Sequence, residues 1–188
     1  MTVREIAVKE GANIALIGFR ASGKSLVGRL LAEELSLAFV DMDARLVASS
    51  GMGIDQWVQS RGWGSFRHEE SKLLKRLARE QGLVVATGGG VVLSAPNRNL
   101  LRSHFLVVWL KASPETTYVR VLKDPGSGTN RPAFTTLPLR EEIRQILAER
   151  SDLYQKTAHI ILETDDALPE QLVSKIRRQL ATGQEERD

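Results

Sequence analysis

The sequence predicts an α/β protein in which a parallel sheet is covered by helices on both faces, giving three layers. Five short apolar runs recur along its 188 residues, and most are apolar throughout, as in strands buried on both faces. Stretches with helical periodicity separate the runs, an order typical of parallel sheets. The runs are IALIG (14–18), AFVDM (38–42), LVVAT (83–87), HFLVVWL (104–110) and HIILE (159–163).

Helical signals lie between these runs. Leucines recur at helical spacing after the first run, at Leu26, Leu30, Leu31 and Leu35. A second helix is predicted through SFRHEESKLLKRLARE (65–80), with Ser65 as a candidate N-cap. In the segment 113–115, Ser, Pro and Glu stand in the order of cap, first-turn proline and first-turn acid, which predicts another helix.

Composition narrows the class of protein. Apolar residues make up 42% of the chain and the formal net charge is +3, so we expect one globular domain over residues 1–188. Basic residues are spread along the chain without aromatic interleaving, which favours a small anionic ligand over nucleic acid. The absence of cysteine, of a signal peptide and of a membrane-length apolar run predicts a cytoplasmic protein without membrane association. The three histidines are far apart, which disfavours a zinc site.

One stretch breaks the alternation of strands and helices. Residues 123–138, KDPGSGTNRPAFTTLP, are rich in Gly, Pro, Ser and Thr and have no periodicity. A loop of this length in a compact domain is usually functional or disordered. The charge of Arg131 at its centre therefore predicts a mobile lid, and residues 181–188, ATGQEERD, predict a polar tail.

The segment Gly18–Ser25, GFRASGKS, matches the phosphate-binding pattern G-x-x-x-x-G-K-[ST]. It lies between a predicted strand and a predicted helix. This is the context of a phosphate-binding loop, and it argues against a chance Gly-rich turn. Its backbone N–H groups can converge on phosphate oxygens at the positive end of the helix. Lys24 can supply charge to the β- and γ-phosphates, and the Ser25 hydroxyl can ligate Mg²⁺. The segment predicts a nucleoside triphosphate site.

Acidic and glycine residues follow the next two runs. Asp41 and Asp43 end the second run, where strand alternation would point both the same way. One can place Mg²⁺ and the other can accept a hydrogen bond from a substrate hydroxyl, although a plain acidic strand end remains an alternative. Gly88–Gly90 end the third run and permit close approach of a ligand to the backbone. Neither NKxD nor DxxG occurs, which disfavours a GTPase switch.

Two arginines are candidates for binding an anion. In the helix predicted over 139–158, Arg150 falls in the middle of an apolar stripe and is expected to face inward. A buried arginine needs an anionic partner, which can be an internal carboxylate or that of a substrate. Arg67 presents the same alternatives, with Glu70 three residues further on as a possible orienting partner.

Six motifs occur in the order seen in shikimate kinases: GFRASGKS, FVDMD, the FR of GSFRHEE, TGGG, the RP of the predicted lid, and ER..LY. The sequence resembles that family over about residues 13–178. The resemblance implies a P-loop kinase fold with a five-stranded parallel sheet and a mobile lid. It also implies ATP-dependent phosphorylation of the 3-hydroxyl of shikimate in aromatic amino-acid biosynthesis, with Mg²⁺. We expect the protein to be a monomer.

The resemblance also implies roles for matching residues. Asp43 would hold the ring hydroxyls and is the candidate to take the proton, and Arg131 would swing in from the lid to neutralise charge on the transferred phosphoryl group. Arg67 and Arg150 would clamp the substrate carboxylate, and residues 164–172 resemble the segment that covers adenine. The implied catalytic residues are Lys24, Asp43 and Arg131. The implied nucleotide-binding residues are Gly18, Ala21, Ser22, Gly23, Lys24, Ser25, Leu26 and Arg131. The implied metal ligands are Ser25 and Asp41. The implied substrate-binding residues are Asp43, Arg67, Glu70, Gly88, Gly89, Gly90 and Arg150.

Two alternatives stay open at this point. A different kinase on the same scaffold, such as a gluconate kinase, would also need an anion clamp, but Arg67 with Glu70 and the TGGG run favour shikimate. A non-catalytic homologue would have no need to keep a phosphate-loop lysine, an acceptor-site aspartate and a lid arginine together. The sequence departs from the family pattern at Leu26 (generally Thr), at Trp63 (usually Glu) and in RPAF, 131–134 (commonly RPLL).

Overall fold

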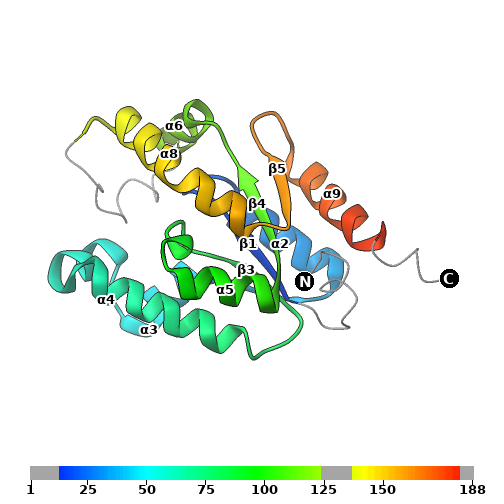
Figure 1. Ribbon diagram of the computed structural model, residues 1–188, viewed down its shortest axis with the longest axis horizontal. Coiled ribbons are helices and arrows are strands. Elements are labelled where there is room, and N and C mark those ends of the chain that lie inside the picture. Colours follow the sequence, from blue (N-terminus) through cyan, green and yellow to red (C-terminus); the bar gives the residue numbers. More distant parts are fainter. Residues whose placement is uncertain (1–12, 124–136, 183–188) are drawn as a thin grey trace.

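A computed structural model describes residues 13–123 and 137–182 (Figure 1). Five parallel strands form one sheet in the order β2-β3-β1-β4-β5, which confirms the predicted fold class. The strands are β1 (Asn13–Ile17), β2 (Ala38–Asp41), β3 (Leu83–Ala86), β4 (Phe105–Lys111) and β5 (Ile160–Glu163). The helices are α2 (Lys24–Leu35), α3 (Met42–Ser50), α4 (Ile54–Leu77), the 3₁₀ turn η1 (Val91–Leu93), α5 (Ala95–His104), α6 (Pro114–Lys123), α8 (Leu139–Thr157) and α9 (Pro169–Thr182). Over these ranges, no helix is both long enough and apolar enough to cross a bilayer.

Alternate residues of the central strand pack into different cores. Ile14 and Leu16 of β1 belong to a cluster with side chains of α2 and α9. Ala15 and Ile17 belong to a second cluster, on the side of α4 and α5. Because side chains alternate along a strand, both faces of β1 are buried, and this explains why its sequence is apolar throughout.

The parallel register brings three strand ends to one edge of the sheet. Ala86, at the end of β3, is aligned with Asp41 of β2 on one side and with Leu16 of β1 on the other. The segments that follow these strands therefore start side by side, although they are far apart in the sequence. Ligands of open parallel sheets bind outside this carboxyl edge.

The predicted N-cap at Ser65 is wrong. Helix α4 is kinked at Gly62 (φ 75°, ψ 162°), and its second half is already under way at Ser65. A positive φ favours glycine, which places the break there rather than at the serine. The Ser65 hydroxyl instead accepts a hydrogen bond from Nε1 of Trp57 at 3.1 Å.

The expected strand alternation of Asp41 and Asp43 is also wrong. Strand β2 ends at Asp41, whose carboxylate accepts a hydrogen bond from the Ala44 N–H at 3.1 Å and so caps α3. Asp43 consequently lies in the first turn of a helix, and its direction is set by that helix rather than by the pleat.

Helix α9 includes the first two residues of the predicted polar tail. Ala181 and Thr182 still belong to α9, whose buried Leu172 and Ile176 pack on the sheet and extend the helical pattern. Residues 183–188 lie outside the described residues, as does most of the predicted lid, residues 124–136.

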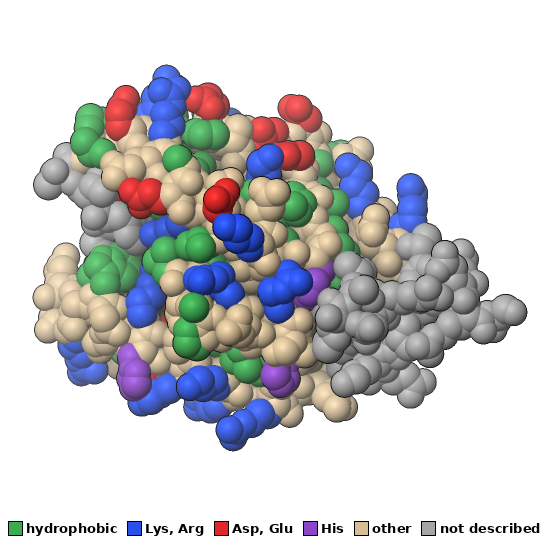
Figure 2. Space-filling model, in the orientation of Figure 1, with side chains coloured by type: hydrophobic (Ala, Val, Ile, Leu, Met, Phe, Trp, Pro, Cys, Tyr) green, Lys and Arg blue, Asp and Glu red, His purple; other side chains and the backbone are tan. Residues whose placement is uncertain are grey.

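Charged side chains are segregated on the face shown in Figure 2. Lysines and arginines gather in its lower half, over α4 and α5, and most acidic side chains lie in its upper half, around α6 and α8. An anion that approaches the α4 side of this face therefore meets a positive surface.

Candidate active site

The loop between β1 and α2 has the backbone shape of an anion-binding turn. Positive φ angles occur at Gly18 (141°), Ala21 (58°) and Gly23 (94°), so the chain turns sharply before α2 begins at Lys24. A Cβ at Gly18 would lie 2.5 Å from the main-chain oxygen of Leu110, which explains the glycine there. Turns of this kind direct successive N–H groups to one point at a helix N-terminus and suit a phosphate.

The Lys24 side chain folds back over this loop. Its Nζ donates to the main-chain oxygen of Phe19 at 2.6 Å and to Oγ of Ser22 at 3.3 Å. Lys24 as a whole is only 9% exposed. A positive charge is thus held where phosphate oxygens would lie.

A hydroxyl and a carboxylate meet next to the loop. Oγ of Ser25 donates to Oδ2 of Asp41 at 2.5 Å. These are oxygen ligands of the kind that Mg²⁺ prefers, and the pair fits a site completed by phosphate oxygens and water. Within residues 13–123 and 137–182, no three His, Asp or Glu side chains gather into a complete metal site. Leu26, the next residue along the chain and one of the implied nucleotide-binding residues, is 54% exposed.

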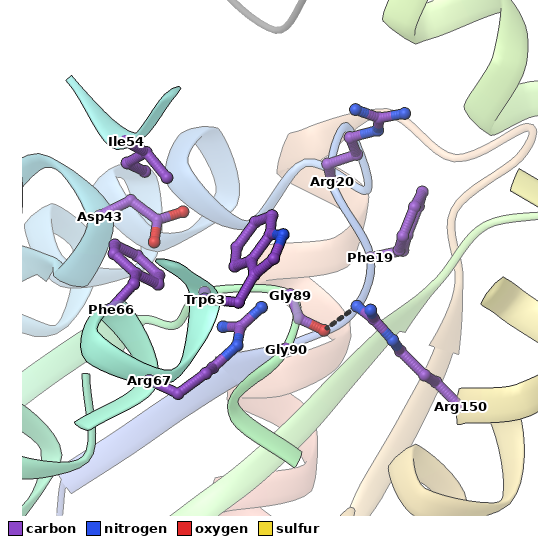
Figure 3. A pocket seen from close by; sticks show the side chains of 11 residues that line it. Phe19, Arg20, Asp43, Ile54, Trp63, Phe66, Arg67, Gly89, Gly90 and Arg150 are labelled. Atoms are coloured by element: carbon purple, nitrogen blue, oxygen red, sulfur yellow. Dashed lines mark hydrogen bonds between the residues drawn. The ribbon is translucent and has the colours of Figure 1, made fainter. Parts of the chain in front are cut away.

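A pocket of about 340 Å³, counting the part open to solvent, lies beside the phosphate loop (Figure 3). The walls come from the loop after β1, the start of α3, α4, the loop after β3, and α8. Six of the seven residues implied as substrate-binding line it: Asp43, Arg67, Gly88, Gly89, Gly90 and Arg150.

Glu70, the seventh, lies behind the wall and orients Arg67. Nη1 of Arg67 donates to both carboxylate oxygens of Glu70 at 2.8 Å, and Glu70 is fully buried. The Arg67 guanidinium also lies over the ring of Trp63, 5.1 Å from its centroid. Charge-assisted bonds and an aromatic surface together hold the guanidinium in one orientation at the pocket.

The glycines of the loop after β3 make room for charged groups. A Cβ at Gly90 would overlap the Arg67 guanidinium, and one at Gly88 would overlap Glu70 and approach Oδ1 of Asp43 to 3.0 Å. Figure 3 shows the Asp43 carboxylate pointing into the space between α3 and this loop. Larger side chains here would displace the acid and the arginine from the pocket.

Arg150 faces inward, as its place in the apolar stripe predicted. It is 7% exposed, and its Nη1 donates to the carbonyl oxygen of Gly89 at 3.2 Å. The hydroxyl of Tyr154 donates to the same oxygen at 2.5 Å. Burial raises the pKa of Tyr154 to about 12, partly opposed by the neighbouring Arg150, so the phenol remains a proton donor at neutral pH.

Three other predictions concern residues that lie outside this pocket or outside the described residues. Asp41 and Asp43 diverge, the first toward Ser25 and the second into the pocket. Arg131 lies outside the described residues. The segment 164–172 is anchored to α6, because Arg120 donates to both the hydroxyl and the carbonyl oxygen of Thr164.

Sequence reasoning missed five residues that line the pocket: Phe19, Arg20, Ile54, Trp63 and Phe66. Arg20 could have been singled out from the sequence, because it places a positive charge at an unspecified position of the phosphate-loop motif, where it needs a counter-charge. That partner is Glu142, 122 residues away, which accepts from Nη2 of Arg20 at 3.0 Å. The sequence marks Trp63 as a departure from the family pattern but gives no sign that it belongs to the site.

Comparisons with known proteins identify the family of this chain. The family model of shikimate kinase matches residues 20–181. "Shikimate kinase 2" of Yersinia pestis (strain Pestoides F) is 39% identical over 171 residues, covering 91% of this chain and 96% of its own length. "Shikimate kinase 2" of Syntrophotalea carbinolica is 38% identical over 154 residues, 82% of this chain and 88% of that protein.

A solved structure is similar over almost the whole chain. The shikimate kinase of Acinetobacter baumannii, solved in complex with shikimate, superposes with a TM-score of 0.87 at 32% identity, covering 95% of this chain and 97% of that one. The family match, the two relatives and the shared fold leave one conclusion: this chain belongs to the shikimate kinase family, whose members are ATP-dependent small-molecule kinases.

Proposed function

We propose that this protein transfers the terminal phosphoryl group of ATP to the 3-hydroxyl of shikimate, with Mg²⁺, in aromatic amino-acid biosynthesis. The observation that carries the proposal is the convergence of Asp43, Arg67 and Arg150 in one pocket beside the phosphate loop. Two guanidinium groups suit a carboxylate, and an acid suits a hydroxyl. In this proposal the protein is a cytoplasmic monomer.

In the proposed mechanism the chain acts by position and charge. Lys24 and the N–H groups of the loop would hold the phosphates, and Ser25 and Asp41, which lie hydrogen-bonded to each other, would hold the metal ion. Bound Mg²⁺ supplies positive charge that neutralises the phosphate oxygens.

Arg67 and Arg150 fix the carboxylate of the acceptor, and this orients its 3-hydroxyl toward the phosphate loop. Asp43 accepts the hydroxyl proton as the oxygen attacks in line, so no covalent enzyme intermediate is needed. Arg131 from the lid neutralises charge on the transferred group.

The test is ADP release by the purified protein with Mg-ATP in the presence of shikimate, gluconate, a nucleoside monophosphate or no acceptor. We expect release that depends on shikimate alone, together with formation of shikimate 3-phosphate. Release with gluconate instead would identify another small-molecule kinase. ATP binding without turnover on any acceptor would identify a non-catalytic homologue.

A further inference from the structure

Two side chains of α8 donate to one carbonyl of the acceptor pocket. The Tyr154 hydroxyl donates to the Gly89 oxygen at 2.5 Å, and Nη1 of Arg150 donates to it at 3.2 Å. The two donors are four residues apart, so they lie on the same face of the helix. Figure 3 shows the Arg150 side chain reaching this carbonyl across the floor of the pocket.

The Tyr154 ring is held rigidly behind the pocket. The residue is fully buried, and its ring stacks on that of Trp109 in β4, with 5.5 Å between centroids and 24° between planes. Strand β4 pairs with β1, which leads into the phosphate loop. The hydroxyl is therefore fixed relative to the sheet and does not line the pocket itself.

The direction of the Gly89 carbonyl also sets the direction of the next N–H. The described peptide bonds are trans, and in a trans peptide the N–H points opposite the C=O. Because the Gly89 oxygen accepts hydrogen bonds from two side chains of α8, the Gly90 N–H points away from these donors. Three successive glycines have unusually large backbone freedom, so this orientation needs an anchor.

We propose that Tyr154 is a positioning residue for the acceptor. Its hydroxyl fixes the Gly88–Gly90 loop, so that the loop N–H groups and the Arg150 guanidinium meet the substrate in one arrangement. The inference rests on the proposed function, because it names the acceptor site as the place where the loop acts. The Tyr154 hydroxyl is bonded to the Gly89 carbonyl and not to the phosphate loop, so we expect its main effect on the acceptor.

Tyr154→Phe tests the inference, because it removes the donor and keeps the ring that stacks on Trp109. We expect the KM for shikimate to rise roughly three- to tenfold, the effect of one ordinary buried hydrogen bond, with the KM for ATP unchanged and kcat within about twofold. The matched control is Thr157→Val. It removes another fully buried hydroxyl one turn along α8, which donates to the Leu153 carbonyl within the helix.

Both variants are expected to lose some thermal stability, but only Tyr154→Phe should change the KM for shikimate. An unchanged KM for shikimate, or equal changes for shikimate and ATP, would overturn the proposal. If the wild-type protein shows no shikimate-dependent turnover, the proposed function is wrong. If the wild type turns over shikimate and Tyr154→Phe leaves the KM for shikimate unchanged, only the positioning role is wrong.

A measurement on the unaltered protein covers the case in which Tyr154→Phe does not fold. The Tyr154 hydroxyl proton, buried and hydrogen-bonded, should exchange slowly and appear as a downfield proton resonance in NMR spectra. We expect this resonance to shift when shikimate is added and to stay in place with ATP alone. If the chemical shift of this proton does not change when shikimate is added, the role proposed for Tyr154 is wrong.

Discussion

Arg20 and Glu142 form an enclosed ion pair that joins the phosphate loop to the first turn of α8. Nη2 of Arg20 lies 3.0 Å from Oε1 of Glu142, and the two side chains are 6% and 2% exposed. Helix α8 also carries Arg150, so this pair connects the phosphate loop to a helix that lines the pocket. Separating such a pair removes a close counter-charge in a poorly solvated place, which is costly.

Glu142→Ala is expected to reduce the free energy of unfolding by about 3 kcal/mol, because it leaves the Arg20 cation buried beside the phosphate loop. The midpoint of urea denaturation measures this change. Glu141→Ala is the control, since Glu141 occupies the same helical turn but is exposed. Equal effects of the two substitutions would show that the ion pair does not matter for stability.

Asp43→Asn is expected to lower kcat by about 100-fold or more, because the amide cannot accept the hydroxyl proton. ATP affinity, measured by calorimetry without acceptor, should stay close to that of the wild type. Asp152→Asn serves as control, because its carboxylate on α8 is 83% exposed. A collapse of nucleotide binding in Asp43→Asn would show that Asp43 has been given the wrong role.

Arg150→Ala is expected to raise the KM for shikimate roughly 10- to 100-fold, the range expected when a charged hydrogen bond to a carboxylate is lost. Arg144→Ala, on the same helix, removes a guanidinium that is 52% exposed and pairs with Glu115, and should leave the KM unchanged. Steady-state kinetics with varied shikimate at saturating ATP make the comparison. A KM that stays at the wild-type value would rule out the carboxylate clamp.

Gly90→Ala is expected to weaken shikimate binding at least about tenfold, because the new Cβ would overlap the Arg67 guanidinium and displace it from Glu70. Gly64→Ala is the matched control: Gly64 lies within α4, and a Cβ there meets nothing within 4 Å. Calorimetric titration with shikimate measures both. Equal affinities in the two variants would mean that Arg67 tolerates a shift of position.

His159 should make the fold less stable in mild acid. Its Nδ1 accepts a hydrogen bond from the Val107 N–H at 3.0 Å, and burial, with a contribution from Arg102, lowers the pKa of His159 to about 4. The unfolded chain binds a proton near pH 6.5, whereas the folded protein does so only near pH 4. Stability from this group is therefore complete above pH 6.5 and decreases as the pH falls toward 4.

We expect a loss of about 1 kcal/mol across this range, well below the full linkage value because His159 is only half-buried. Urea denaturation at several pH values measures the slope. His159→Asn keeps an acceptor for the Val107 N–H but cannot titrate, so its slope should be smaller. His104→Asn, at an exposed position, should behave as the wild type. Identical slopes in all three proteins would exclude His159 as the cause.

The features that could be predicted from the sequence are those with a local or periodic signal. The strands are predictable because each is a short, mostly apolar run, and β1, β3 and β4 are buried on both faces. Arg150 is predicted to face inward because it interrupts an apolar stripe of one helix. The phosphate loop is eight contiguous residues whose glycines and lysine have a direct chemical purpose. In such cases the neighbours in the chain are also the neighbours in space.

Local patterns failed where a turn or a cap competes with periodicity. Asp41 and Asp43 do not follow strand alternation, because Asp41 ends the strand and caps α3. Ser65 is not an N-cap, because the break in α4 lies at Gly62. Where a helix begins depends on which of several adjacent residues accepts hydrogen bonds from its free N–H groups. The sequence pattern alone does not show which of these residues does so.

Only the tertiary structure decided which distant residues form the site. Tyr154 reaches Gly89 across 65 positions, and Arg20 reaches Glu142 across 122. Such pairs leave no spacing in the sequence, because they arise from the order of strands in the sheet and from the helix faces that this order brings together. By itself, therefore, the sequence determined the layers, the phosphate loop and a set of candidate charges. The packing of α8 against the sheet decided how those charges and the glycine loop are aimed at one pocket.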